Sequence, residues 1–192
     1  MTHSLLRRIA IIGGAALGLA LLPLGGAFAW AGYLQATGNI HEVEPGVYRS
    51  KQLDGDQLAV LLQDKGIRTV INLRGGTIED SWYRDEVAAV ASAGARLIDI
   101  PLLETVAPDQ EQLARLLDAL QHAPTPLLIH CKAGADRAGL AAALYELVVA
   151  GKPALEASGQ LSFAYGHFPW LGSGTAAMDV AFWDYVSQED QP

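Results

Sequence analysis

Hydrophobic and polar positions divide the chain into an uncharged apolar stretch near its start and a longer region of mixed character. No charged residue occurs between Ile9 and Ala36, and as a helix this stretch would span about 42 Å, more than the ~30 Å core of a bilayer. Arg7 and Arg8 precede it, and the first acidic residue is Glu42. Because positive charge stays cytoplasmic, the pattern predicts a membrane segment with the amino terminus inside and the rest of the chain outside.

Two interpretations of residues 9–36 remain open. One is an uncleaved anchor, which the length of the stretch favours. The other is a secretory signal, with Arg7 and Arg8 as its basic start and the small residues Ala27 and Ala29 flanking Phe28 at a cleavage site. Both interpretations place the remainder of the chain outside the cytoplasm.

Beyond this stretch, short apolar runs alternate with amphipathic segments. Apolar residues at helical spacing, with proline, glycine or acidic residues near the ends, predict helices over residues 54–65, 81–93, 108–121, 138–150, 153–161 and 175–187. β-Branched or continuous apolar runs predict strands over residues 47–49, 69–73, 96–100 and 127–130. No element is predicted for residues 39–46, and residues 163–174 are predicted as a loop rich in aromatic residues and glycine.

This order of elements predicts an α/β fold. Strands that alternate with helices over short connections favour a sandwich with a central, mainly parallel sheet flanked by helices. The chain then divides into an N-terminal segment, residues 1–36, and one folded domain, residues 37–190. Composition agrees, because 192 residues with 51 % hydrophobic and 18 % charged residues suffice for one core and argue against disorder.

Charge and cysteine content narrow the possible functions. Lysine and arginine total 13 against 21 aspartates and glutamates, a net charge of −8, and no basic stripe indicates a nucleic-acid partner. A single cysteine excludes an internal disulfide and a multi-cysteine metal site. His41, His122 and His167 show no metal-ligand spacing, so we expect neither a metal nor another cofactor.

Candidate chemistry concentrates between the strand predicted at residues 127–130 and the helix predicted at residues 138–150. The connecting sequence runs HCKAGADRAG from His130 to Gly139. An open α/β sheet binds its ligand at such a point, where a loop that opens a helix aims successive N–H groups at an anion. Besides Asp136, the expected phosphate-binding loop contains Lys132, Ala133, Gly134 and Ala135.

Cys131 and Arg137 lie at the two ends of this loop. A field that binds phosphate also stabilises a thiolate, so we expect Cys131 to be ionised and nucleophilic. Arg137 can fold back over the loop as a planar fork and bind two phosphate oxygens. A thiolate below a bound phosphate, with a guanidinium to stabilise its oxygens, predicts phosphoryl transfer to sulfur.

The sequence HCKAGADRAG resembles the H-C-x5-R signature of the cysteine-dependent protein tyrosine and dual-specificity phosphatases. A looser likeness to bacterial, membrane-associated and fungal-type members extends over residues 48–50, 70–74 and 100–102. The resemblance implies hydrolysis of a phosphorylated protein or small phosphomonoester through a phosphocysteine on Cys131. It implies substrate and transition-state binding by Arg137 and no metal. Together with the apolar segment and the arginines before it, it leads us to expect a periplasmic domain anchored in the inner membrane, or released if the N-terminal segment is cleaved.

Two departures from the family pattern matter for catalysis. Members usually carry Ser or Thr directly after the arginine, where the hydroxyl assists hydrolysis of the intermediate, whereas this chain has Ala138; we therefore expect a slow second step. The family's upstream aspartate, which protonates the leaving group, has no clear counterpart. Candidates are Asp136 within the loop, which some similar phosphatases are thought to use, Glu104 upstream, and Asp99 or Asp109 beside it.

Alternative functions stay open. Without the hydroxyl and with an uncertain acid, the domain could be a catalytically inactive phosphate-binding module. A phosphoinositide or inositol phosphate phosphatase would usually carry more basic residues in this loop than Lys132, which either steers anions or is simply solvated. His130 is expected to be structural and to bond the loop, and Arg74 to form a surface ion pair or to reach the substrate. The sequence does not indicate an oligomeric state.

Overall fold

A computed structural model describes residues 25–170 and 173–189 of the chain. The chain divides into two compact units, residues 1–36 and residues 37–192. In the first unit, residues 25–36 form a helix, and most of the predicted membrane segment lies outside the described residues. No helix in the described part of the chain is both long enough and apolar enough to cross a bilayer.

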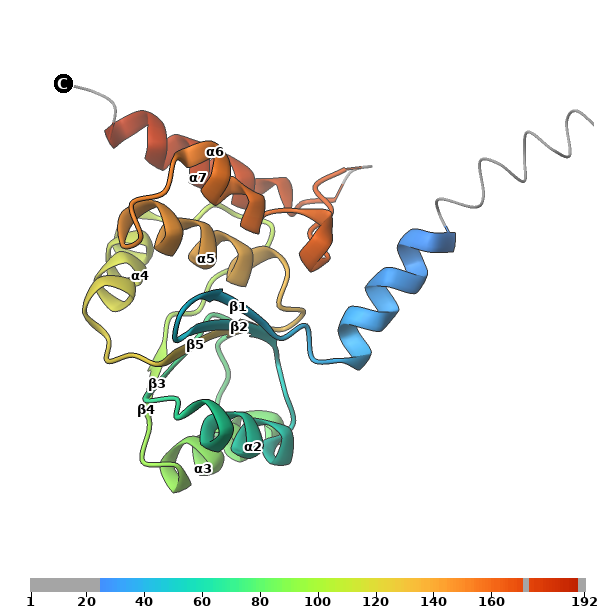
Figure 1. Ribbon diagram of the computed structural model, residues 1–192, viewed down its shortest axis with the longest axis vertical. Helices are drawn as coiled ribbons and strands as arrows, with labels where there is room; N and C mark the ends of the chain where they lie inside the picture. Colours follow the sequence, from blue (N-terminus) through green and yellow to red (C-terminus); the bar gives the residue numbers. More distant parts are fainter. Residues whose placement is uncertain (1–24, 171–172, 190–192) are drawn as a thin grey trace, which may run out of the picture. The chain divides into compact units, whose positions relative to one another are not determined.

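Five strands of the second unit form one twisted sheet in the order β1-β2-β5-β3-β4 (Figure 1). Their bounds are His41–Glu44 for β1, Val47–Lys51 for β2, Thr69–Asn72 for β3, Arg96–Asp99 for β4 and Leu127–Cys131 for β5. β2, β5, β3 and β4 run parallel, and β1 pairs antiparallel with β2 at one edge. The prediction of a mainly parallel sheet is confirmed, and β5 lies at its centre.

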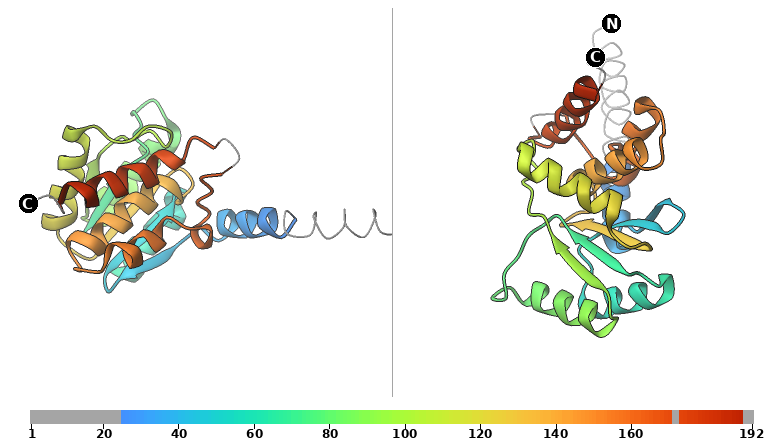
Figure 2. Two further views of the ribbon diagram at one scale, coloured as in Figure 1. Left: turned by 90° about the horizontal axis from the view of Figure 1, so that it is seen from above. Right: turned by 90° about the vertical axis from the view of Figure 1, so that its left-hand side faces the viewer.

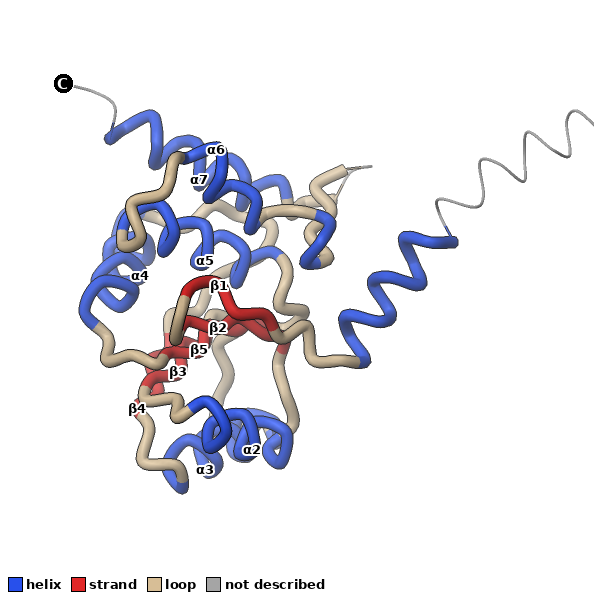
Figure 3. Tube along the Cα trace, viewed as in Figure 1, coloured by secondary structure: helices blue, strands red, loops and turns tan. Residues whose placement is uncertain are grey.

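Helices cover both faces of the sheet, as the side view in Figure 2 and the colouring by secondary structure in Figure 3 make clear. One face carries α2, Gly55–Lys65, and α3, Ser81–Ser92. The other carries α4, Gln110–His122, α5, Asp136–Val148, α6, Ala154–Ala157, and α7, Ala176–Glu189. Short 3₁₀ turns follow α6 at Ser158–Gln160 and Phe163–Tyr165.

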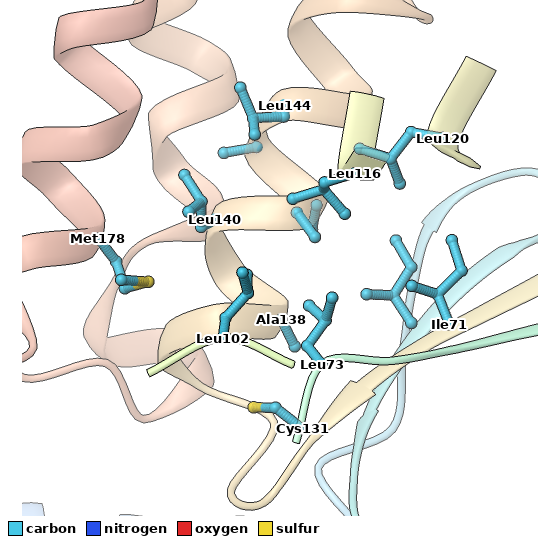
Figure 4. Packing of buried hydrophobic residues seen from close by; sticks show 14 of the residues in the cluster. Ile71, Leu73, Leu102, Leu116, Leu120, Cys131, Ala138, Leu140, Leu144 and Met178 are labelled. Carbon is cyan, nitrogen blue, oxygen red and sulfur yellow. The ribbon is translucent and has the colours of Figure 1, made fainter. Parts of the chain in front are cut away.

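Two hydrophobic clusters fix the layers. The smaller one joins the sheet to α2 and α3 through residues such as Leu62, Val70 and Val90. The larger joins the sheet to α4, α5 and α7, and Figure 4 shows part of it, with Leu116 of α4 and Leu140 of α5 among the labelled side chains. Because α5 lies between the sheet and α7, it is apolar on nearly all sides, and its first turn is fixed relative to β5.

Most predicted elements are confirmed within a few residues, and the differences have local causes. The helix predicted from residue 138 begins at Asp136, because the small residues before it continue directly into helical backbone. The helix predicted from residue 108 begins at Gln110, since Asp109 is its N-cap in a capping box with Gln112. β1 was not predicted, because its four residues, HEVE, include only one apolar residue, Val43. The helix predicted over residues 153–161 splits into α6 and a 3₁₀ turn.

Candidate active site

The predicted phosphate-binding loop connects the end of β5 to the start of α5. β5 is flanked by β2 and β3, and Cys131 ends β5 in register with Lys51 of β2. The carboxyl ends of three parallel strands therefore meet beneath this loop, where α/β sheets bind ligands. This is the position expected from the sequence.

Cys131 is 1 % exposed and belongs to the larger hydrophobic cluster. Figure 4 shows its side chain beyond the end of β5, next to Ala138 and Leu73. A second buried group, the guanidinium of Arg49 in β2, lies near it. Burial lowers the pKa of Arg49 to about 10, and the negative charge of a Cys131 thiolate opposes that shift. Arg49 therefore remains a cation at neutral pH and stabilises negative charge on the sulfur.

Arg49 also shapes the loop. Its Nη2 donates to the carbonyl oxygens of Gly134 and Ala135, at 2.9 Å each, and its Nη1 donates to the backbone and side-chain oxygens of Gln160 at 2.7 and 2.8 Å. In a trans peptide the N–H points opposite to the C=O, so the N–H groups of Ala135 and Asp136 point away from Arg49. Those groups are then available to an anion above Cys131.

Gly134 is required by both conformation and space. Its φ is +72°, and a Cβ atom there would lie 2.5 Å from the backbone nitrogen of Lys51 and 2.6 Å from the carbonyl carbon of Ser50. Only glycine allows the loop to pass this close to the end of β2. Lys132 and Ala133 precede it; Lys132 is exposed, and the carbonyl of Ala133 accepts from Asn39 Nδ2 at 3.0 Å.

Arg137 lies in the first turn of α5, and its side chain is held by residues of other segments. Its Nη1 donates to the carbonyl oxygens of Leu73 and Leu102, at 3.3 and 3.0 Å, which fixes the guanidinium plane. Its Nη2 lies 2.7 Å from Oε2 of Glu104. Its buried Nε has no hydrogen-bond partner among residues 25–170 and 173–189. Nε and Nη2 form one edge of the fork, which is the edge that can bind two phosphate oxygens.

The candidate acids lie in different surroundings. Glu104 has 45 % of its side chain exposed and Arg137 as its ion-pair partner. Asp136 lies in the loop, but its Oδ1 is 2.7 Å from Nδ1 of the buried His167. The structure therefore pairs Glu104 with Arg137 and holds Asp136 on a histidine.

Asp99 and Asp109 have structural partners. The carboxylate of Asp99 accepts from Asn72 Nδ2 at 2.9 Å and from the hydroxyl of Tyr83 at 2.6 Å. That hydrogen bond and burial raise the pKa of Tyr83 to about 12. Asp109 caps α4 by accepting from the backbone of Gln112 at 2.8 Å.

Two neighbouring residues differ from expectation in their partners. His130 is buried, but its Nε2 pairs with Glu86 of α3 at 3.1 Å rather than with the loop. Glu86 also accepts from Gln52 at 2.8 Å, so this set ties β5 to α3 and is structural. Arg74 lies over the ring of Trp82 at 3.8 Å, a cation–π contact in place of the expected ion pair.

Sequence reasoning missed three residues that support the loop: Arg49, Asn39 and His167. Asn39 donates to Ala133 of the loop and to the carbonyl of Tyr165 at 2.9 Å, and His167 pairs with Asp136. An arginine directly after the apolar Val47 and Tyr48 in a predicted strand was a usable signal for Arg49. Nothing in the sequence pairs residue 39 or 167 with residues in the loop. In the described part of the chain, no group of three or more His, Cys, Asp or Glu side chains could hold a metal ion.

Comparison with known proteins agrees with this geometry. Residues 35–166 match the family described as DSP-PTPase phosphatase fused to NAD+ kinase, which confirms the resemblance found in the sequence. The dual specificity protein phosphatase TpbA of Pseudomonas aeruginosa strain UCBPP-PA14 is 35 % identical over 125 residues, which make up 64 % of this chain and 53 % of TpbA. The chain thus spans about half the length of the curated relatives it matches.

Solved structures show the same fold. The crystal structure of Pseudomonas aeruginosa TpbA superposes with a TM-score of 0.59 at 24 % identity, covering 80 % of this chain and 91 % of that one. The core catalytic domain of the PP-IP phosphatase Siw14 from Saccharomyces cerevisiae gives a TM-score of 0.57 at 16 % identity, covering 79 % and 90 %. These likenesses concern the arrangement of strands and helices.

Proposed function

Because the chain belongs to the DSP-PTPase phosphatase family, we propose that it hydrolyses phosphomonoesters, with phosphotyrosine or another phosphorylated protein side chain as substrate. One observation carries the proposal: the loop between β5 and α5 combines a thiol at its base with inward N–H groups and a fixed guanidinium. The buried, unpartnered Nε of Arg137 supplies a donor for a tetrahedral anion beside Cys131.

In the first step the Cys131 thiolate attacks phosphorus. The S–P bond forms while the P–O bond to the leaving group breaks, and the leaving oxygen takes a proton. The loop N–H groups and the Nε–Nη2 edge of Arg137 bind the equatorial oxygens, where charge develops in the transition state. The product of this step is a phosphocysteine, and the arrangement requires no metal.

We assign the proton to Glu104. Its side chain is 45 % exposed, and its ion pair with Arg137 occupies Nη2, which a phosphate dianion needs. A substrate that binds Arg137 displaces Glu104 from Nη2, so the carboxyl group is free to lie beside the leaving oxygen. Asp136 is less suited, because an ionised carboxylate that accepts from His167 carries no proton to give.

In the second step water attacks the phosphocysteine and the thiolate leaves. Ala138 follows Arg137 and is fully buried, so this position offers no hydroxyl to the departing sulfur. The second step is therefore the slower one, and the intermediate accumulates.

The substrate class is proposed from the site's charge. Lys132 is the one cation between Cys131 and Arg137, which suits a single phosphate better than a polyphosphate. A solved structure of Pseudomonas aeruginosa TpbA, 23 % identical, is described as a complex with phosphotyrosine, which supports the same choice.

Hydrolysis by the purified full-length chain tests the proposal. The substrates are an aryl phosphate, a phosphotyrosine peptide, a phosphoserine peptide and inositol hexakisphosphate, and the control is Cys131→Ser. We expect turnover of the aryl phosphate and the phosphotyrosine peptide, abolished by the substitution. Tight phosphopeptide binding without turnover would establish a binding module instead. Preferential release of phosphate from inositol hexakisphosphate would establish an inositol phosphate phosphatase.

We also propose that residues 9–36 attach the protein to the inner membrane with the phosphatase domain in the periplasm. The uncharged stretch and the preceding Arg7 and Arg8 support this. Fractionation of bacteria that express the full chain tests it: we expect the protein in the membrane fraction and open to protease in spheroplasts. Protein in the soluble periplasm would indicate cleavage near residue 29, and protein in the cytosol would contradict export.

A further inference from the structure

A buried chain of three ionisable side chains lies directly behind the phosphate-binding loop. The ring of His167 has no exposed surface; its Nδ1 is 2.7 Å from Oδ1 of Asp136, and its Nε2 is 2.8 Å from Oδ2 of Asp179. Asp136 begins α5, His167 lies in the connection before α7, and Asp179 lies in the first turn of α7. The ring of His167 thus links α5, which follows the phosphate-binding loop, to α7.

Hydrogen-bond chemistry fixes how many protons this chain holds. Ionised carboxylates only accept, so a ring that bonds to both must carry a proton on each nitrogen. A neutral ring can keep both bonds only if one carboxyl takes the second proton. The three groups therefore share two protons. If either proton is lost, one of the two hydrogen bonds breaks, because a ring nitrogen without a proton then faces an ionised carboxylate oxygen.

The surrounding charges favour the imidazolium. Burial of the ring lowers the pKa of His167, but the hydrogen bonds and charges of Asp136 and Asp179 outweigh it and hold the pKa above the usual 6.5. The carboxylate of Asp136 also interacts with the cation of Arg49 in β2. Asp136 from α5 and Asp179 from α7 are thus the charged groups that act on the ring, and Arg49 from β2 acts on Asp136. With the ring as an imidazolium, the two carboxylates and the two cations sum to no net charge, whereas a neutral ring would leave one net negative charge beside the loop.

Asp136 is held on both of its sides. The peptide before it is fixed by Arg49, which binds the carbonyl of Ala135, and its side chain is fixed by His167. The segment that carries His167 is itself tied to the loop, because Asn39 bridges the carbonyl oxygens of Tyr165 and Ala133. Arg137 follows Asp136 directly, so the direction in which its fork points depends on this first turn.

We propose that His167 is a positioning residue for the phosphatase reaction: clamped as an imidazolium between Asp136 and Asp179, it holds the first turn of α5 and Arg137 in the phosphate-binding conformation. The inference rests on the function proposed above. The same proton also neutralises Asp136, whose carboxylate would otherwise repel a phosphate dianion. Activity is therefore lost as pH rises through the titration of His167.

The first test is an NMR titration of His167 in the full-length chain, followed with and without inorganic phosphate. We expect a pKa above 6.5 that rises further with phosphate, because a bound dianion favours the imidazolium. A ring that titrates at or below 6.5, or that does not respond to bound phosphate, would overturn the inference. Since this readout needs no turnover, it stays informative even if the chain binds phosphate without hydrolysing it.

The second test uses kinetics with an aryl phosphate whose good leaving group needs little protonation, in a Glu104→Gln background that removes the other candidate acid. We expect His167→Asn to lower kcat/KM by about 10- to 100-fold and to weaken inhibition by inorganic phosphate. Asp179→Asn, which leaves the ring in place but removes one negative charge, is expected to move the alkaline limb of the kcat/KM profile to lower pH.

The matched control is Asp118→Asn, which removes the carboxylate of an exposed aspartate–histidine pair on α4, at 3.1 Å from His122. Its pH profile is expected to coincide with that of the parent. Thermal unfolding of each variant separates loss of fold from loss of position. Unchanged profiles in both His167→Asn and Asp179→Asn would contradict the role of His167 while leaving the phosphatase function intact, whereas absence of Cys131-dependent turnover would contradict the function itself.

Discussion

At the scale of single residues, the site depends on Arg49, a cation that is fully buried and has no surface open to solvent. It binds the loop carbonyls on one side and both oxygens of Gln160 on the other. The loop's inward N–H groups follow from those bonds. Its role is therefore to fix an anion site rather than to touch the anion.

Replacement of Arg49 by lysine tests that role. Lysine keeps the charge, but one ammonium cannot reach acceptors on both sides, so buried carbonyls lose their donor. We expect the free energy of unfolding in urea to fall by about 2–4 kcal/mol, with a parallel loss of kcat/KM. Arg68→Lys, at an exposed arginine directly before β3, is the control and should stay within about 0.5 kcal/mol of the parent. Equal stability of the two variants would contradict the account.

Ala138 offers a gain-of-function test. A serine there supplies the hydroxyl that similar phosphatases carry, so Ala138→Ser is expected to speed hydrolysis of the phosphocysteine and reduce the pre-steady-state burst. Ala141→Ser is a matched control, since Ala141 is equally buried in the next turn of α5 but one turn further from Cys131. An identical burst in both variants, or none in the parent, would show that the second step does not limit turnover.

Residue identity led to candidates for the reacting groups but not to their supports. Cys131 and Arg137 could be proposed because their spacing and the strand–loop–helix context define one local geometry. Asp136 could not be separated from Glu104, because the partners that distinguish them, His167 and Arg137, lie 31 and 33 positions away in sequence. Contacts between distant segments leave no periodic signal in a single sequence.

At the scale of elements, the N-terminal caps of α4 and α2 can be compared, because only α4 follows the segment that carries Glu104. Asp109 caps α4 and Asp54 caps α2 in the same way, each accepting from the backbone three residues on at 2.8 Å. Only α4 follows the segment that carries Glu104, and its Gln112 also donates to the carbonyl of Pro101 at 2.9 Å. The two caps therefore share one hydrogen bond, but only the cap of α4 has a capping box and lies next to the segment that carries Glu104.

Alanine at each cap separates stability from catalysis. Asp54→Ala and Asp109→Ala are each expected to cost about 1 kcal/mol of unfolding free energy. Only Asp109→Ala is expected also to lower kcat, most for substrates with poor leaving groups, because it loosens the segment before α4. If both variants kept the parent's kcat, residues 101–109 would not govern proton transfer.

Elements whose sequences show strong periodicity or clear end signals were predicted well. Elements that form because of contacts with distant segments were missed or had their ends misplaced. α4 shows its leucine stripe and its acidic start in the sequence. β1 is four residues long and exists because it pairs with β2 across Gly46, which has a φ of +79°. α5 is buried on nearly every side, so its start could not be read from an amphipathic pattern.

At the scale of the whole molecule, the buried imidazolium makes stability depend on pH. The pKa of His167 is raised on folding, so its contribution to stability is fully present below about 6.5, the unfolded value, and is lost as pH rises through the folded value. The difference in unfolding free energy between the parent and His167→Asn is therefore expected to be largest below that pH. If the difference in unfolding free energy between the two proteins stayed constant over about two pH units on either side of neutrality, the ring would not be charged.

Direct detection of the covalent intermediate tests the central claim, that Cys131 is the nucleophile of a phosphatase. The full-length chain is mixed with an aryl phosphate, quenched in acid within its first turnovers and analysed by intact mass and peptide mapping. We expect one added phosphoryl group, located on Cys131, accumulating with the burst of released phenol and absent from Cys131→Ser. Turnover without that adduct, or turnover that survives the serine substitution, would contradict the account.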